Sequence, residues 1–271
     1  RRGQQAYAQE SLALARAARD DAFQASFHYC HAAALEYIGS TDELMAAYES
    51  GIRASRRSDD AVLLAHGLSA RAARHSLLGN QAKAVPDLLA ALKLYQDAGD
   101  EESAEYLLLD IAICYRRMGE FAKALEYLEK NEAHALRNTD WSTLVSNLLQ
   151  QGYLAEDEGR VDDAIAIYDR ALEISREHDR RSEAASIHLA KAYPAILQGE
   201  YRQALQLIQV AQSEFEALGD RANDEMIALR LGQAHAGLGQ HVQALADYDR
   251  AAVALERSGN QRYLAMLHEA R

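Results

Sequence analysis

Residues 152–172 read GYLAEDEGRVDDAIAIYDRAL, and the glycine inside this stretch, Gly159, recurs at a spacing of 40 residues along the chain. A fixed period of roughly 20 to 50 residues is typical of proteins built from stacked structural repeats. The sequence therefore predicts a repeat array before the chemistry of any single residue is considered. The recurring glycines are Gly39, Gly79, Gly119, Gly159, Gly199 and Gly239.

Each of these glycines separates two helical patterns. In the quoted stretch Ala164, Ile165 and Tyr168 follow Gly159 by five, six and nine residues, and such offsets fall on one face of a helix. The position seven residues before each recurring glycine always carries Gly or Ala, and in the quoted stretch it is Gly152. Such small residues indicate the close approach of a second helix. The chain is expected to alternate A helices, which precede the glycine, with B helices, which follow it.

Helix boundaries are expected to repeat with the same period. Asp recurs 19 residues before the glycines and is a good N-cap, because its carboxylate accepts hydrogen bonds from first-turn amides. Arg180 breaks this pattern, so Asp179 is expected to cap there, and Gly99, Gly219 and Gly259 are expected to end B helices in the left-handed conformation. The A helices are expected near 21–38, 61–78, 101–118, 141–158, 181–198 and 221–238, the B helices near 42–57, 82–97, 122–137, 162–177, 202–217 and 242–257, and further helices near 4–18 and from 261.

The pattern resembles the tetratricopeptide repeat family over essentially the whole chain. The resemblance implies an all-α fold, a right-handed superhelical solenoid of antiparallel helix pairs with about six full repeats and a half repeat at each end, in which residues 1–271 form a single array. The period of 40 exceeds the roughly 34 residues usual in the family and is similar to the long repeats of bacterial regulators and kinesin light chains. The residues that carry the resemblance most clearly are Leu231, Gly232, His235, Gly239, Ala244, Leu245, Tyr248 and Ala251.

Composition agrees with a cytoplasmic helical array. Of the 271 residues 49% are hydrophobic and 26% charged, which is too apolar for a disordered chain, and no apolar run approaches the roughly 20 residues that cross a bilayer. The net charge of −12 disfavours direct nucleic-acid binding. Cys30 and Cys114 lie in different repeats, which favours a reducing compartment. Because the sequence begins without Met and stops within a repeat, we expect a fragment of a longer protein.

Few residues suggest catalysis or a metal site. His28 and His31 share a helix face, but no second pair of ligands lies at matching phase in the next repeat to complete a tetrahedral site. No phosphate-binding glycine loop or nucleophile motif occurs in the sequence. Glu156 and Asp157 are expected on a solvated face, where they stack beside Arg116 and Arg117 of the preceding repeat, and an ion pair between the two repeats is expected rather than an acid–base pair. The sequence predicts no enzyme, no metal and no cofactor.

The resemblance also implies where a partner binds. The concave wall of tetratricopeptide arrays is lined by the A helices, and the Lys and Asn clamp with which some members hold a chaperone carboxylate is missing here. Leucines and tyrosines at these positions favour an apolar or amphipathic protein segment, with Lys or Arg flanks that the charge of −12 attracts. Burial of the leucines between the helices is the alternative. The candidate groove residues are Tyr106, Leu109, Leu149, Gln150, Tyr153, Leu189, Tyr193, Leu229, Arg230 and Gln233.

These observations predict a non-enzymatic protein-interaction scaffold. Its resemblance to arrays that precede diguanylate cyclase or transcriptional activator domains implies the regulatory or sensory part of a larger bacterial signalling protein. Two alternatives remain open. One is a self-association module that forms homo-oligomers through the ends of the array, and the other is a small-molecule sensor that uses the concave groove.

Overall fold

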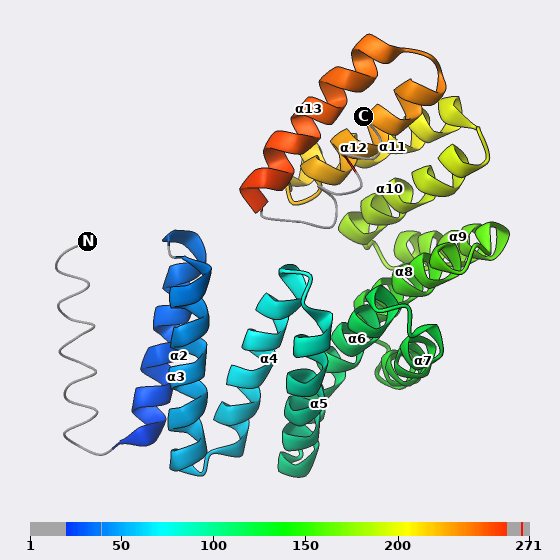
Figure 1. The fold of residues 1–271 in the computed structure, drawn as a ribbon. Coiled ribbons are helices and arrows are strands. Elements are labelled where there is room, and N and C mark those ends of the chain that lie inside the picture. The colour runs from blue at the N-terminus through cyan, green and yellow to red at the C-terminus, as the bar shows by residue number, and fades with distance from the viewer. Residues whose placement is uncertain (1–19, 39, 259–266, 268–271) are drawn as a thin grey trace. The chain divides into compact units, whose positions relative to one another are not determined.

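The structure, a computed structural model, describes residues 20–38, 40–258 and 267 (Figure 1). Within these ranges every regular element is an α-helix. The A helices are α2 (Asp21–Ile38), α4 (Ala61–Leu77), α6 (Glu101–Arg117), α8 (Trp141–Asp157), α10 (Arg181–Leu197) and α12 (Asp224–Gly237). The B helices are α3 (Thr41–Ser58), α5 (Gln81–Ala98), α7 (Phe121–Asn138), α9 (Val161–Glu177), α11 (Tyr201–Leu218) and α13 (His241–Ser258).

The predicted helix boundaries are confirmed to within one residue, apart from the start of α12. The turn glycine Gly159 has φ +76, and a Cβ built there would meet open space. Glycine is therefore required here by the left-handed backbone conformation and not by a lack of space for a side chain. The helices expected near 4–18 and from 261, together with Gly39 and Gly259, lie outside the described residues.

The ends of the B helices confirm one expectation and correct another. Gly99 and Gly219 have φ values of +73 and +69 and follow α5 and α11 as predicted. Asp179, expected to cap α10, has φ +53 and takes the same left-handed role after α9. Arg180 stands at the N-cap of α10 without a side-chain capping bond. The expectation for Asp179 was wrong because Asp tolerates the left-handed conformation nearly as readily as it caps a helix.

The start of α12 also differs from the expectation. Asp140 accepts a hydrogen bond from the backbone nitrogen of Thr143, three residues ahead, at 3.1 Å, and α8 begins at once. Asp220 instead accepts from the nitrogen of Ala222, two residues ahead, at 2.8 Å. Such a bond closes a local turn rather than a helix cap, so α12 begins at Asp224, three residues later than predicted.

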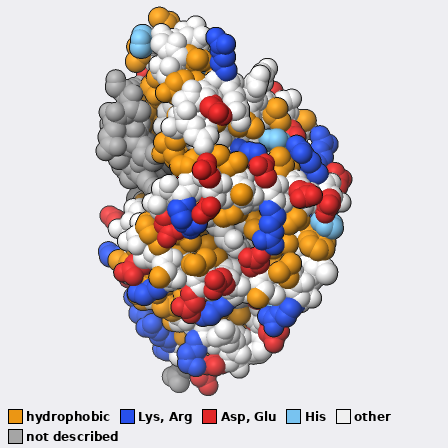
Figure 2. Space-filling view, turned by 90° about the vertical axis from the view of Figure 1, so that its right-hand side faces the viewer, with side chains coloured by type: hydrophobic (Ala, Val, Ile, Leu, Met, Phe, Trp, Pro, Cys, Tyr) orange, Lys and Arg blue, Asp and Glu red, His pale blue; other side chains and the backbone are white. Residues whose placement is uncertain are grey.

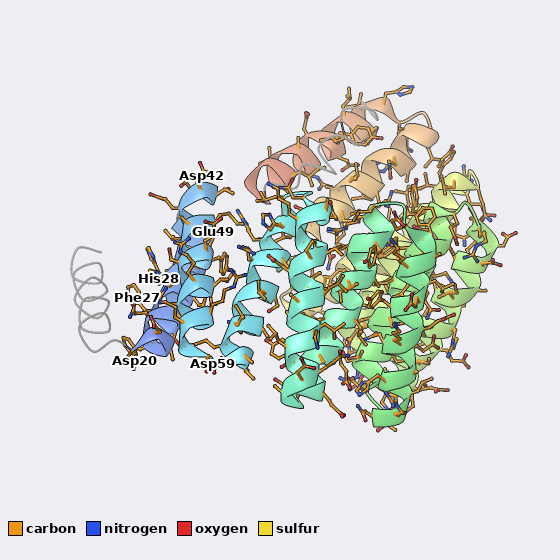
Figure 3. All side chains as sticks on the ribbon, turned by 60° about the horizontal axis from the view of Figure 1, so that its bottom comes forward. Asp20, Phe27, His28, Asp42, Glu49 and Asp59 are labelled. Atoms are coloured by element: carbon orange, nitrogen blue, oxygen red, sulfur yellow. The ribbon has the colours of Figure 1, made fainter. Side chains whose placement is uncertain are left out.

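Packing divides the chain into two units, which are described separately: unit 1 comprises Arg1–Ser76 and Asn80–Cys114, and unit 2 comprises Leu77–Gly79 and Tyr115–Arg271. In unit 1, α2 and α3 form an antiparallel pair. Figure 3 shows Asp20, at the start of α2, at the same end of this pair as Asp59, which follows α3, while Asp42 lies at the opposite end. In unit 2, α8 pairs with α9, α10 with α11, and α12 with α13.

The repeated small residue of the A helices makes room for an aromatic residue of the B helix. A Cβ added at Gly152 would lie 2.1 Å from the Tyr168 ring, and one added at Gly232 would lie 2.5 Å from the Tyr248 ring. Tyr168 is fully buried in the core of unit 2. Glycine is therefore needed at these two positions for close packing. No helix in the described part of the chain is long and apolar enough to span a membrane.

Candidate functional site

The structure separates the predicted groove residues into surface and core. In unit 2, Leu149 and Gln150 of α8 are half-buried, whereas Leu189 is 5% exposed and Leu229 is 1% exposed. Leu189 and Leu229 belong to the hydrophobic cores around α10 and α12, so neither side chain is presented to a ligand. In unit 1, Tyr106 is 61% exposed and Leu109 is half-buried.

Three predicted residues meet where α10 packs against α12. The guanidinium carbon of Arg230 lies 3.9 Å from the ring centroid of Tyr193, well within the roughly 6 Å of a cation–π contact. Nη1 of Arg230 donates a hydrogen bond to Oε1 of Gln233 at 2.9 Å. Tyr193 and Gln233 are half-buried, while Arg230 is only 8% exposed. The arginine therefore lies flat beneath the surface rather than extending into solvent.

A second arginine covers the other predicted tyrosine. Arg116, at the end of α6, lies over the ring of Tyr153 with its guanidinium carbon 5.4 Å from the centroid. It also forms an ion pair with Asp157 of α8, which confirms the pairing predicted between neighbouring repeats. The Arg116 side chain is only 9% exposed, so this pair is less solvated than the sequence indicated. Nε of Arg116 has no hydrogen-bond partner among the described residues.

Glu156 interacts electrostatically with the arginine of each of these pairs. Its Oε1 accepts a hydrogen bond from the hydroxyl of Tyr168 at 2.9 Å. Burial raises the pKa of Glu156 to about 7; the hydrogen bond from Tyr168 and the positive charges of Arg230 and Arg116 lower it, and the negative charge of Asp157 raises it. Glu156 therefore changes protonation near neutral pH, in contrast with the solvated carboxylate that the sequence suggested.

Together these groups form what we call the Arg–Tyr cluster, built in unit 2 on the end of α6 and on α8, α9, α10 and α12. Burial raises the pKa of the Tyr168 hydroxyl, so this group keeps its proton and acts as a donor to Glu156. The cluster combines flat aromatic surface with two cationic groups and one proton-exchanging carboxyl group. Such a combination suits recognition of a partner better than it suits bond cleavage. Its members are Arg116, Tyr153, Glu156, Asp157, Tyr168, Tyr193, Arg230 and Gln233.

A buried amide network holds α8 beside α7 near the cluster. Nδ2 of Asn147 donates to Oδ1 of Asn131 at 2.8 Å and to the carbonyl oxygen of Leu128 at 2.9 Å, and both asparagines are fully buried. The sequence reasoning missed this pair. One signal could have found it, because Asn131 stands where the next repeats carry Ala171 and Ala211. Satisfied buried polar pairs fix one packing arrangement, and this one fixes the helix that carries Tyr153 and Glu156.

Metal binding finds no support in the described residues. No group of three or more His, Cys, Asp or Glu residues there could hold a metal ion. Near the predicted pair of histidines, His28 packs edge-on against Phe27 with 5.7 Å between ring centroids, and Figure 3 labels both on α2. Cys30 and His31 are exposed.

Comparisons with known proteins agree with this fold. Residues 145–178 match the model of the tetratricopeptide repeat family. The chain is 35% identical over 99 residues to the photosystem I assembly protein Ycf3 of Rippkaea orientalis, a match that covers 35% of this chain and 54% of that protein. The chain thus spans about half the length of the curated relative it matches.

Solved structures extend the likeness to nearly the whole chain. The Rap conjugation gene regulator of plasmid pLS20, solved with the Phr* peptide, is 15% identical with a TM-score of 0.72 over 97% of this chain and 78% of that one. Apo RapI is 18% identical with a TM-score of 0.69 over 89% and 86%. NprR, solved with its cognate peptide NprX, is 12% identical with a TM-score of 0.69 over 92% and 72%. Residues 145–178 thus match one tetratricopeptide repeat, and the chain as a whole shares its helical-repeat fold with these solved structures.

Proposed function

We propose that this chain is a non-enzymatic protein-interaction module that binds a peptide segment on the A-helix face of unit 2. The observation that carries the proposal is the stacking of an arginine on each of two half-buried tyrosines, Arg116 on Tyr153 and Arg230 on Tyr193. Tyrosine and arginine are, with tryptophan, the side chains enriched at the energetic centres of interfaces. Two proteins of similar fold were solved with bound peptides, which supports a peptide as the ligand.

The partner segment is expected to carry apolar anchors and basic flanks. Leu149, Tyr153 and Tyr193 are half-buried and leave apolar surface for the anchors, whereas the core residues Leu189 and Leu229 no longer belong to the proposed contact surface. The flanks follow from the net charge of −12, which attracts Lys and Arg over long range. Figure 2 shows acidic and basic side chains interspersed on one face of the molecule, so steering depends on the net charge rather than on one large patch.

The wider role in the cell follows from the same proposal. A peptide-binding array suits the regulatory or sensory part of a larger bacterial signalling protein in the cytoplasm, of the diguanylate cyclase or transcriptional activator type. The similar structures include a conjugation gene regulator, which favours regulation over a purely structural scaffold. The sequence of the complete reading frame tests this context, because it would reveal a catalytic or DNA-binding domain.

The test of the binding surface removes both aromatic contacts. A Tyr153→Ala/Tyr193→Ala double variant is expected to bind peptides selected on the wild-type chain at least about tenfold more weakly, because such anchors contribute about 2 kcal/mol or more. A Val210→Ala/Leu218→Ala variant is the matched control, since both residues are exposed on α11. Wild-type affinity in the tyrosine variant, with an unchanged helical signal, would contradict the proposal and move the site to the B-helix face or the array ends.

A small-molecule sensor remains a second candidate because unit 2 also contains a cavity of about 740 Å³. It lies where α12 begins late, with Phe215 and Ile227 among its apolar lining and Asp220 and Asp224 among its acidic lining. Arg221 and Arg250 also line this cavity. The cavity, rather than the concave groove, is where a small molecule with apolar and polar groups would fit. Thermal stabilisation by such compounds that disappears in an Ile227→Trp variant would favour this candidate.

Self-association is supported by apolar residues on α13. Val242 is 81% exposed and Leu245 is 53% exposed. Exposed apolar surface of this kind tends to associate with another protein surface. Light scattering across a range of concentrations measures this tendency. A strict monomer at high concentration would remove this alternative.

A further inference from the structure

Arg230 is an interior cation without a direct ion pair among the described residues, although its charge acts on Glu156 at longer range. The residue is 8% exposed, its guanidinium lies on Tyr193, and its one hydrogen bond goes to the neutral amide of Gln233. Within the part of the chain that the structure describes, no carboxylate lies within salt-bridge distance of it. Burying a charge costs free energy unless a partner compensates it. The free protein therefore maintains a cationic group whose strongest interaction is not yet made.

Two other interior arginines have such a partner. Arg71 of α4 forms two parallel hydrogen bonds with the carboxylate of Asp87 on α5, at 2.7 and 2.8 Å. Arg116 pairs with Asp157. Arg74 of α4 and Arg180, just before α10, are half-buried and each has an Nε without a hydrogen-bond partner among the described residues. Arg230 differs from them because it is more deeply buried, at 8% exposed, and lies on the ring of Tyr193 in the Arg–Tyr cluster.

We infer that the segment bound at the Arg–Tyr cluster presents a carboxylate group to Arg230. This inference rests on the proposed function, because it specifies one chemical group of the peptide whose binding the proposed function requires. The guanidinium carries five N–H donors in a planar fork that matches the two oxygens of a carboxylate, and Gln233 occupies only Nη1. An acidic side chain and the C-terminus of the segment both supply this group. The basic flanks of the bound segment lie outside the Arg–Tyr cluster, where the net charge of −12 attracts them.

The charge balance of the cluster favours a carboxylate over a phosphate. A phosphate group carries a charge of roughly −1.5 to −2 at neutral pH and needs more than one available cation. Arg116 is already paired with Asp157, so Arg230 is the one unpaired cation of the cluster. Asp157 lies in the same cluster and adds negative charge, as does Glu156 to the extent that it is ionised. One monovalent group compensates Arg230 with the least repulsion.

Glu156 couples this binding step to protons. The groups that face it are Tyr168 from α9, Arg116 from α6 and Arg230 from α12, with Asp157 on its own helix. A ligand carboxylate at Arg230 adds a negative charge near Glu156 and withdraws the positive charge that favours its ionised form. Binding is therefore accompanied by proton uptake at Glu156, and the affinity falls as the pH rises above neutrality.

The experiment uses a synthetic peptide array made in two copies, one with free and one with amidated C-termini, probed with the purified chain. Bound peptides are expected to contain Asp or Glu, or to lose binding when amidated, and these two results separate the two sources of the carboxylate. An Arg230→Gln variant is expected to bind them at least about tenfold more weakly, as for other hydrogen bonds to charged groups. Arg230→Lys should restore part of this loss, and Arg202→Gln, which alters an exposed arginine of α11, should have no effect.

Proton uptake supplies an independent readout. Calorimetric titration of a selected peptide near pH 7, in two buffers with different ionisation enthalpies, is expected to show protons taken up by the wild type and none by a Glu156→Gln variant. Peptides that bind without any acidic group, or an Arg230→Gln variant of unchanged affinity, would overturn the inference and leave the proposed function intact. Binding restricted to phosphorylated peptides would also overturn it. A chain that binds no peptide in either copy would overturn the proposed function, and this inference with it.

Discussion

Arg71 in unit 1 and Arg230 in unit 2 are both interior arginines of A helices, but their surroundings differ. Arg71 lies against Asp87 with two hydrogen bonds of 2.7 and 2.8 Å, and these bonds raise its pKa above the ordinary value. Arg230 lies on the ring of Tyr193, 3.9 Å from its centroid, and donates only to Gln233. The first arginine joins α4 to α5 as part of the fold. The second adds a charge that the fold itself does not use.

The comparison indicates that Arg71 contributes to the stability of the fold, whereas Arg230 contributes to ligand binding. Removing the partner of a paired interior charge is strongly destabilising, whereas an interior charge without a direct partner opposes folding. Helix pairs of the same design thus form a structural scaffold around Asp87 and a binding surface around Arg230. The expected effects below follow from this comparison.

The largest expected effect comes from removing the paired arginine. Arg71→Met leaves the carboxylate of Asp87, whose side chain is 12% exposed, without its partner, and should lower the free energy of unfolding by about 3 kcal/mol. Arg230→Met leaves no such partner behind and should cost less than about 1 kcal/mol. Urea denaturation of both variants measures the contrast. Equal losses, or a larger loss for Arg230→Met, would show that Arg230 is a structural residue.

The next effect concerns Glu156 and depends on pH. Its pKa of about 7 lies above the ordinary value of 4.5, so the folded state holds a proton that the unfolded state releases. The associated stability is fully present below pH 4.5 and is lost as the pH rises through about 7. A Glu156→Gln variant keeps an acceptor for Tyr168 and should exceed the wild type by about 2 kcal/mol near pH 8, with little difference near pH 4. A constant difference at both pH values would contradict the burial of this carboxyl group.

The smallest effect distinguishes the two stacked tyrosines. Tyr193→Leu removes the ring that supports an unpaired guanidinium and should cost about 1 kcal/mol. Tyr153→Leu should cost less, because Arg116 keeps its ion pair with Asp157. Denaturation midpoints of the two variants give the comparison. A larger cost for Tyr153→Leu would mean that the ring of Tyr153 supports the core more than it supports Arg116.

Much of the fold followed from the sequence because local signals repeat in phase. Gly159 and its equivalents mark the turns, and Asp140 marks a helix start, so the boundaries were recovered within one residue. An ion pair between Arg116 or Arg117 and Glu156 or Asp157 was also predictable, since the two pairs of residues lie one period apart, and the structure forms it between Arg116 and Asp157. The start of α12 was missed because Asp220, the same residue type as Asp140, forms a shorter turn.

The site was recovered only in part, because it depends on how neighbouring side chains fill space. In α8, Leu148 fills the core and Leu149 stays half-buried, whereas at the equivalent positions of α12 Ala228 is small and Leu229 is buried beside it. The sequence placed Arg230 on the wall but gave no sign of its approach to Glu156 from a helix two repeats away. That proximity comes from tertiary packing, which a repeat period does not encode.

The pKa of the Glu156 side chain in the free chain, measured by NMR through its carboxyl carbon, tests the central claim most directly. That claim is that Arg230 has no ionised partner until a ligand supplies one. We expect a pKa of about 7, which rises further when a carboxylate-bearing peptide binds and stays unchanged when the amidated or neutral version is added. A pKa near 4.5 would contradict the claim, because Glu156 would then already serve as the counter-charge of Arg230 at neutral pH.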